Sequence, residues 1–452
     1  MQQAAMAADG GPADPAPLQP ESPRLRALET ALASHDNTAQ AAFWQEVQRT
    51  GTPIIEPIPG DPNDVLYTFV WRAARDQVAI NVQFNGWFPL HVSRGFDEFS
   101  RLADSNVWYT SYTLPKNAQF RYELISPKGW HAAPDRATYF TMDNREYETF
   151  HDPFNHELID WNGSMTSHAH GPDATTSQFL DKRADVAEGK VEKLSLPGDE
   201  LQHRPPLRIY LPAEYQRTHR DYGVVLAYDG NQYTHGVPMP MILDNMIASG
   251  AIPPVIAVFL ESPDREKEFP PNDEFQAYVG KVLMPQIRKR YRASRDPSRS
   301  AVLGSSYGGL AATYTAIKHP DLFGNVISQS GSYGWYPALP TSGTPATTGA
   351  PATPGTQGTS SAVPLINGPR GVSPETGWLI KRVAELPREK IRFYLDAGTW
   401  EGGGMLSANR LMHAVLEGKG YAVTYHEEPG THSSYYWMLR LPDGLKAALG
   451  KR

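Results

Sequence analysis

The sequence predicts an α/β fold with a mostly parallel sheet, preceded by a smaller all-β sandwich domain. Two patterns indicate this division. From about residue 191 onward, short apolar runs alternate with longer helix-like stretches, which is typical of strands covered by helices. Between about residues 51 and 150, single apolar residues alternate with polar ones, which is typical of half-buried antiparallel strands. A third observation, a glycine-flanked serine at one strand-to-helix junction, defines the α/β part further.

The front of the chain is expected to form a domain of residues 24–160 behind a disordered tail, residues 1–23. The tail is rich in Ala, Pro, Gly and Gln, and the stretch 25–50 predicts one leading helix. The alternating apolar residues that predict strands include Val65, Tyr67, Phe69, Trp71, Val78, Ile80, Val82, Phe84, Phe120, Tyr122 and Leu124. Residues 161–180, where Gly, Ser, Thr and His cluster, are expected to be a linker.

Residues 181–452 are predicted to form the α/β domain. Its expected strands are Leu207–Leu211, Gly223–Tyr228, Pro254–Leu260, Ser300–Leu303, Val326–Gln329, Ile391–Leu395 and Ala422–Glu427, and its expected helices are Met239–Ala248, Asp273–Tyr291, Leu310–Lys318, Met405–Glu417 and Ser434–Leu441. Pro442 is expected to end the last helix because proline has no N–H to donate. Residues 341–363, rich in Ser, Thr, Pro, Gly and Ala, predict a low-complexity insertion that forms a mobile loop.

The glycine-flanked serine lies in the sequence Gly304-Ser305-Ser306-Tyr307-Gly308. This is the Gly-x-Ser-x-Gly pattern, here between a buried strand and a helix, as in the α/β-hydrolases. In that fold the serine occupies a strained turn, and a Cβ on the flanking glycines would clash where strand and helix approach each other. Ser306 is therefore the predicted nucleophile.

Candidates for an acid and a base follow Ser306 in the order that this fold uses, serine, acid and then histidine. Asp396 and Glu401 both follow the strand Ile391–Leu395, and either carboxylate suits the acid, with Glu401 preferred. His432 lies on the loop before the last helix and is the predicted base. A serine hydroxyl needs an imidazole to take its proton, and the imidazole needs a carboxylate to fix its tautomer.

Acyl transfer also needs two backbone N–H donors for the developing oxyanion. Tyr307, directly after the nucleophile, is the first predicted donor. The second is expected from the loop Asp229-Gly230-Asn231-Gln232, with Asn231 as the candidate.

Composition limits the other classes of function. Hydrophobic residues are 40% and charged residues 20% of the 452, and the formal charge of −7 argues against a nucleic-acid or anionic-membrane binder. There is no cysteine, so disulfides, thiolate metal ligands and a cysteine nucleophile are excluded. No apolar run is long enough to span a membrane, and the start lacks the pattern of a signal peptide, so a cytoplasmic protein is expected. We expect no metal and no cofactor.

The chain resembles the enterochelin (ferric enterobactin) esterase family over nearly its whole length. The motifs that carry the resemblance are Leu226–Gly230, Glu268–Phe275, Gly304–Gly309, Val326–Tyr333, Asp396–Glu401, Asn409-Arg410 and Gly430–His432, and in the front half Gly51–Pro57, Phe69–Arg72 and Asp152–Asn155. Thr431 and Ser433 depart from the residues common beside the family's histidine, and the insertion 341–363 is unfamiliar. These departures leave the chemistry intact and leave the choice of siderophore open.

The resemblance implies a serine esterase that opens the ester bonds of an iron-loaded catecholate siderophore and so allows iron release. By motif matching, Ser306, His432 and Glu401 are the catalytic residues, and Arg265 matches a basic position that suits an anionic iron-catecholate. Trp335 and Trp400 are further expected substrate contacts. One alternative is a carboxylesterase of the same fold acting on feruloyl or other acyl esters. Another is a ligand-binding protein without activity.

Overall fold

The computed structural model describes residues 21–73, 81–84, 99–127, 147–161, 164–196, 204–337 and 377–450. It divides into two compact units, a front unit of residues 1–84 and 94–174 and a main unit of residues 85–93 and 175–452. The insertion 341–363 and the first 20 residues of the predicted tail lie outside the described residues. The end of that tail is ordered, since Ser22 caps the first helix by accepting from the Leu25 N–H.

The single helix expected over residues 25–50 is wrong, because the structure has two. Helix α1 spans Pro23–Ala33 and helix α2 spans Ala39–Thr50. Between them His35 has φ +61°, in the left-handed region that a helix cannot continue through. Both helices bury apolar side chains in one cluster, which includes Leu25, Leu28, Phe43, Trp44 and Val47.

The described strands of the front unit form two antiparallel sheets. Their bounds are β1 Ile54–Pro57, β2 Asp64–Arg72, β3 Asn81–Phe84, β4 Ser100–Arg101, β5 Val107–Pro115, β6 Gln119–Pro127, β7 Tyr147–Phe150, β8 Leu158–Trp161 and β9 Ser164–His170. The sheet orders are β1-β2-β5-β4 and β3-β6-β9-β8, with β7 also paired to β6. Rings from the two sheets touch: the centroids of Phe69 on β2 and Tyr122 on β6 are 4.8 Å apart.

The linker expected over residues 161–180 contains a strand instead. Strand β9 pairs with both β6 and β8, and the division between the units falls at Ala174. Its buried polar side chains are hydrogen-bonded: Ser167 Oγ accepts from the Asp152 N–H at 2.7 Å. A polar composition resembles a linker, but here the polar groups have partners inside the unit.

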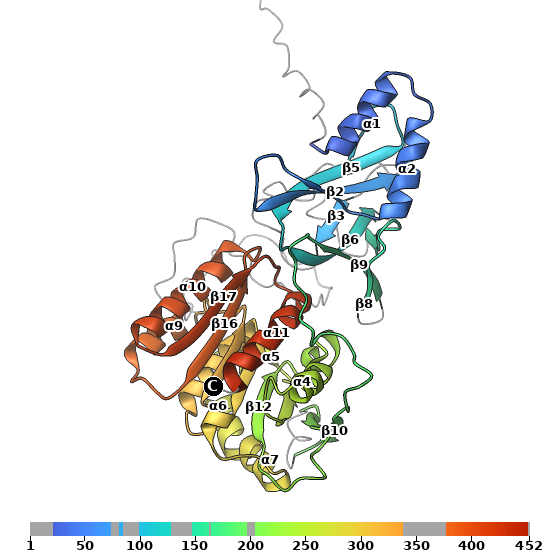
Figure 1. The fold of residues 1–452 in the computed structure, drawn as a ribbon. Coiled ribbons are helices and arrows are strands. Elements are labelled where there is room, and N and C mark those ends of the chain that lie inside the picture. Colours follow the sequence, from blue (N-terminus) through green and yellow to red (C-terminus); the bar gives the residue numbers. More distant parts are fainter. Residues whose placement is uncertain are drawn as a thin grey trace, which may run out of the picture. The chain divides into compact units, whose positions relative to one another are not determined.

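The main unit has an eight-stranded sheet in the order β10-β11-β13-β12-β14-β15-β16-β17. Strands β10 and β11 are antiparallel to their neighbours, and the strands from β13 to β17 run parallel. The bounds are β10 Lys190–Leu194, β11 Leu207–Leu211, β12 Gly223–Tyr228, β13 Val255–Leu260, β14 Ala301–Ser305, β15 Asn325–Gln329, β16 Arg392–Gly398 and β17 Ala422–Glu428. The predicted mostly parallel sheet is therefore confirmed (Figure 1).

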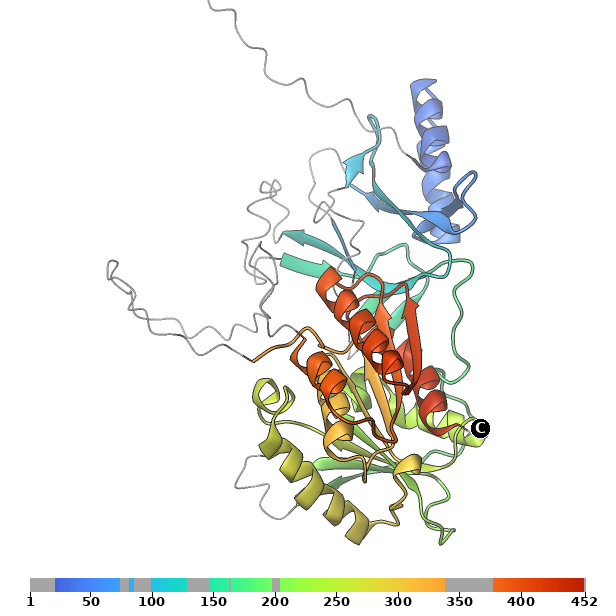
Figure 2. The ribbon, with the colours of Figure 1, turned by 90° about the vertical axis from the view of Figure 1, so that its left-hand side faces the viewer.

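Helices cover both faces of this sheet (Figures 1 and 2). They are η3 Gln232–Gly236, α4 Met239–Ala248, α5 Arg265–Glu268, α6 Asp273–Tyr278, η4 Val279–Leu283, α7 Met284–Arg290, η5 Pro297–Arg299, α8 Tyr307–Lys318, α9 Trp378–Glu385, α10 Gly403–Gly418 and α11 Ser434–Leu449. Alternate residues of β12 enter two cores: Val224 and Leu226 pack with α7 and α8, whereas Val225 and Ala227 pack with α4 and α11. A strand buried on both faces explains the continuous apolar runs of the sequence.

Helix α11 does not end at Pro442 as expected, but continues to Leu449. Proline removes one backbone hydrogen bond, and in the turn before it the Gln329 side chain donates to the Trp437 carbonyl at 2.9 Å. Leu445 and Leu449, beyond the proline, are buried in the core shared with α4. The burial of this last turn outweighs the lost hydrogen bond.

Candidate active site

Ser306 occupies a sharp turn between β14 and α8. Its backbone has φ +56° and ψ −122°, a conformation that is strained for a residue with a side chain. The turn is tight, since a Cβ on Gly304 would lie 2.3 Å from the Gly308 carbonyl carbon, and one on Gly309 would lie 2.6 Å from Ser328 Oγ. The predicted need for glycine before Ser306 is thus explained by contact between strand and helix backbones.

His432 and Glu401 meet on the two neighbouring strand ends. Glu401 follows β16 and His432 follows β17, and His432 Nδ1 lies 3.1 Å from Glu401 Oε2. Glu401 is fully buried, and 12% of the His432 side chain is exposed. A buried carboxylate on Nδ1 leaves Nε2 as the nitrogen available to a reacting hydroxyl.

Asp396, the other candidate acid, lies inside β16 and is fully buried. Its Oδ2 accepts from Gln329 Nε2 at 3.3 Å. Burial raises the pKa of Asp396 to about 8. The geometry therefore favours Glu401 over Asp396 as the partner of the histidine.

A network that sequence reasoning missed holds Glu401. The Ser330 hydroxyl donates to Glu401 Oε1 and accepts from Trp437 Nε1 at 2.9 Å, and the Gly398 N–H donates to the same Oε1 at 3.0 Å. The Trp437 ring stands at 85° to the His432 ring, with centroids 5.0 Å apart. Ser330 lies within the family-like motif Val326–Tyr333, directly after the carboxyl end of β15, and that position was the available signal.

Ser306 has a second serine beside it. Ser306 Oγ and Ser332 Oγ are 3.2 Å apart, and the Ser332 N–H donates to the Ser306 carbonyl at 3.0 Å. The Ser306 N–H donates to the Gln329 carbonyl at 2.9 Å. The loop after β15 therefore fixes the backbone of Ser306 as well as the side chain of Glu401.

The two predicted oxyanion donors differ in their hydrogen bonding. Tyr307 is the first residue of helix α8, and within the described residues its N–H donates to no protein acceptor. The Asn231 N–H donates to Glu261 Oε2 at 2.7 Å. In this structure the second predicted donor is therefore hydrogen-bonded to a carboxylate of the protein.

The three predicted substrate contacts differ in their exposure and in their hydrogen-bond partners. Trp335 is half-buried, and its N–H donates to the Ser332 carbonyl at 3.0 Å. Trp400 is 1% exposed, so the expectation that it contacts substrate is wrong. Its N–H donates to the Gly430 carbonyl at 3.0 Å, which joins the loops of Glu401 and His432. Arg265 is held by Asp229 through two hydrogen bonds, of 2.8 and 2.9 Å.

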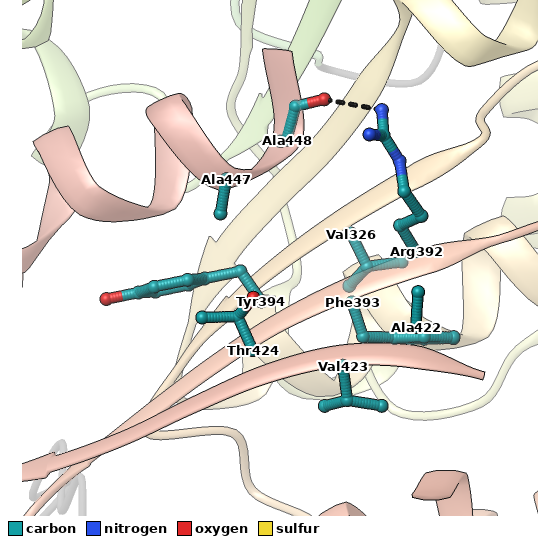
Figure 3. Close-up of a pocket in the computed structure, with 9 residues that line it drawn as sticks. All are labelled: Val326, Arg392, Phe393, Tyr394, Ala422, Val423, Thr424, Ala447 and Ala448. Atoms are coloured by element: carbon teal, nitrogen blue, oxygen red, sulfur yellow. Dashed lines mark hydrogen bonds between the residues drawn. The ribbon is translucent and has the colours of Figure 1, made fainter. Parts of the chain in front are cut away.

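A hollow of about 160 Å³ lies at the other end of the strands. It is lined by Val326, Arg392, Phe393, Tyr394, Ala422, Val423, Thr424, Ala447 and Ala448. Arg392 starts β16 and donates to the Ala448 carbonyl at 2.9 Å (Figure 3). Because Glu401 follows the carboxyl end of that strand, this hollow is separate from the candidate site.

The described part of the chain has no group of three or more His, Cys, Asp or Glu residues that could hold a metal ion. None of its helices combines the length and apolar character needed to cross a membrane.

The strand order, the strained serine and the histidine with its buried carboxylate define the main unit as an α/β-hydrolase. Residues 198–448, more than half of the chain, match the family described as "Putative esterase", and residues 66–179 match "Enterochelin esterase, N-terminal". The chain therefore belongs to this esterase family, in the branch that carries the enterochelin esterase N-terminal domain. The resemblance stated from the motifs is confirmed.

Relatives match along almost the whole chain. An iron(III) enterobactin esterase of Dickeya dadantii is 27% identical over 92% of this chain and 94% of its own. An iron(III) salmochelin esterase of Escherichia coli is 22% identical over 95% of this chain and 98% of its own. The crystal structure of the enterobactin esterase from Shigella flexneri in the presence of enterobactin has TM-score 0.63 and 21% identity, covering 90% of this chain and 97% of that one.

Proposed function

We propose that the protein is a serine esterase that hydrolyses the ester bonds of a catecholate siderophore, with Ser306, His432 and Glu401 as its catalytic residues. The observation that carries the chemistry is the His432–Glu401 pair at 3.1 Å, together with a serine held at φ +56°. The substrate class is supported by relatives named for enterobactin and salmochelin that match both units.

In the proposed mechanism, His432 Nε2 takes the proton of Ser306 as Oγ attacks the ester carbonyl. The alkoxide leaves with that proton, and an acyl-enzyme on Ser306 remains. Water, activated by the same histidine, then releases the acid and restores the serine. Glu401 keeps the imidazole oriented and stabilises its charged form, which suits a carboxylate that is buried and holds two further hydrogen bonds.

The negative charge on the carbonyl oxygen would be stabilised by the Tyr307 and Asn231 N–H groups. The hydrogen bond from Asn231 to Glu261 supports this use, because this N–H already donates to a carboxylate oxygen. The substrate oxygen would replace the Glu261 carboxylate there. Trp335, three residues beyond Ser332 in the same loop, is the remaining proposed contact near the reacting ester.

For the front unit, we propose that its two sheets pack face to face as a sandwich. The support is ring contact between them: besides Phe69 and Tyr122, Tyr67 and Phe120 have centroids 5.6 Å apart.

Three substrates test the function: an iron(III)-loaded catecholate trilactone, the same trilactone without iron, and a feruloyl ester. Products are separated by chromatography. We expect rapid conversion of the trilactone to linear fragments and much slower feruloyl cleavage. Faster feruloyl cleavage would overturn the proposed substrate and favour the carboxylesterase alternative. No cleavage of any ester, with no labelling by an organophosphonate, would favour a binding protein.

A further inference from the structure

We propose that Arg265 is a positioning residue for the oxyanion site rather than a contact for the anionic substrate. Its guanidinium group holds Asp229 and faces the Tyr307 ring, so one side chain fixes both backbone segments that carry the proposed donors. The inference rests on the proposed function in assuming a serine esterase, but it is independent of which ester is the natural substrate.

The first link runs to the loop after β12. Arg265 Nε donates to Asp229 Oδ1 at 2.8 Å, and a terminal nitrogen donates to Oδ2 at 2.9 Å. Such paired hydrogen bonds fix the carboxylate in direction as well as in distance. Asp229 is 7% exposed and has φ +53°, so its backbone is strained and needs such support. Asn231, the proposed donor, is two residues farther on.

The second link runs to the turn of Ser306. The Arg265 guanidinium lies over the Tyr307 ring, 5.5 Å from its centroid. A Cβ placed on Gly308 would be 3.1 Å from Asp229 Oδ2, so the carboxylate rests against the backbone of α8's first turn. The ion pair therefore joins the loop that carries Asn231 to the first turn of α8, which begins at Tyr307. A shift of about 1 Å in such a donor is enough to lower a rate strongly.

The same contacts argue against a primary role of Arg265 in binding the negative charge of the substrate. Asp229 and Arg265 neutralise each other, and the third guanidinium nitrogen lies 3.9 Å from Glu266. An arginine paired on these sides has little positive charge left to attract an anionic ligand. A positioning residue and a substrate contact also differ in kinetics, because the first lowers kcat on every ester and the second raises KM for the anionic one.

The test uses the full-length Arg265→Gln and Arg265→Lys variants on a small neutral ester, p-nitrophenyl butyrate, and on the iron-loaded trilactone. Removing an oxyanion donor outright costs about 10²–10³ in kcat. Misplacing the donors should therefore lower kcat of Arg265→Gln by about 10- to 100-fold on both esters, with KM nearly unchanged. The Lys variant keeps the charge but loses the paired geometry, so its kcat should fall between Gln and wild type. Phosphonylation of Ser306, which develops similar charge, should slow in parallel.

Arg382→Lys is the matched control, because Arg382 also pairs with a carboxylate, Glu385, and lies over a ring, Trp378. It should retain wild-type kcat. A second variant, Asp229→Asn, removes the carboxylate and should lower kcat like Arg265→Gln.

A raised KM for the trilactone with unchanged kcat on p-nitrophenyl butyrate would overturn the positioning role. So would full kcat in Asp229→Asn. If wild type cleaves the small ester but not the trilactone, the proposed substrate fails while the Arg265 test still stands.

Discussion

At the scale of single residues, Glu401 is the proposed catalytic carboxylate, and Asp396 is proposed to have a structural role. Glu401→Gln should lower kcat by about 10³- to 10⁴-fold, because an amide no longer stabilises the imidazolium of His432. Asp396→Asn should keep kcat within about threefold, since Asp396 bonds Gln329 instead. Steady-state rates on p-nitrophenyl butyrate, with circular dichroism to check folding, make the comparison. A larger loss in Asp396→Asn would reverse the assignment.

Asp396 should instead affect how the stability of the folded protein depends on pH. Burial raises its pKa to about 8 in the folded protein, from an ordinary value of 3.8. Between these values the folded state holds a proton that the unfolded state has released, so stability falls as pH rises from about 4 to about 8 and changes no further above that.

Replacing Asp396 by Asn should remove this contribution, so the variant should gain stability over wild type as the pH increases across that window. Urea unfolding at pH 5, 6.5 and 8 measures it. A difference between the proteins that is the same at all three values would contradict the raised pKa.

At the scale of elements, the turn between β14 and α8 should tolerate no side chain at Gly304, two residues before Ser306. Gly304→Ala should abolish activity and lower stability, because its Cβ would lie 2.3 Å from the Gly308 backbone. Gly418→Ala, the last residue of α10 with nothing within 4 Å of the added Cβ, should instead stabilise by about 0.5–1 kcal/mol. Thermal unfolding and esterase rates distinguish the two. An active, stable Gly304→Ala protein would contradict the tight turn.

The bounds of some helices and strands could be predicted from sequence patterns alone, and others could not. Strands buried on both faces, such as β11 and β12, were predicted to the residue because their apolar runs have clear ends. Strand β9 was missed because its residues are polar and gain their partners from β6 and β8. The end of α11 was missed because tertiary burial beyond Pro442 overrides a local rule.

At the scale of the whole molecule, the candidate site combines residues that are far apart in the chain. Their order, serine, acid and histidine, made Ser306, Glu401 and His432 predictable, because the fold brings consecutive parallel strand ends to one edge. The supporting contacts were not predictable. Ser330 with Trp437, or Arg265 with Asp229, are ordinary residue types separated by 107 and 36 positions, so only the folded backbone brings them together.

Ser306 is proposed to carry the acyl group during ester hydrolysis. A comparison of kcat between wild type and Ser306→Ala on the iron(III)-loaded catecholate trilactone, with both proteins shown to be folded, tests this role. We expect kcat to fall by several orders of magnitude, about 10⁴-fold or more, because the nucleophile is lost while alanine fits the turn. A variant that kept a tenth of the wild-type rate would contradict it.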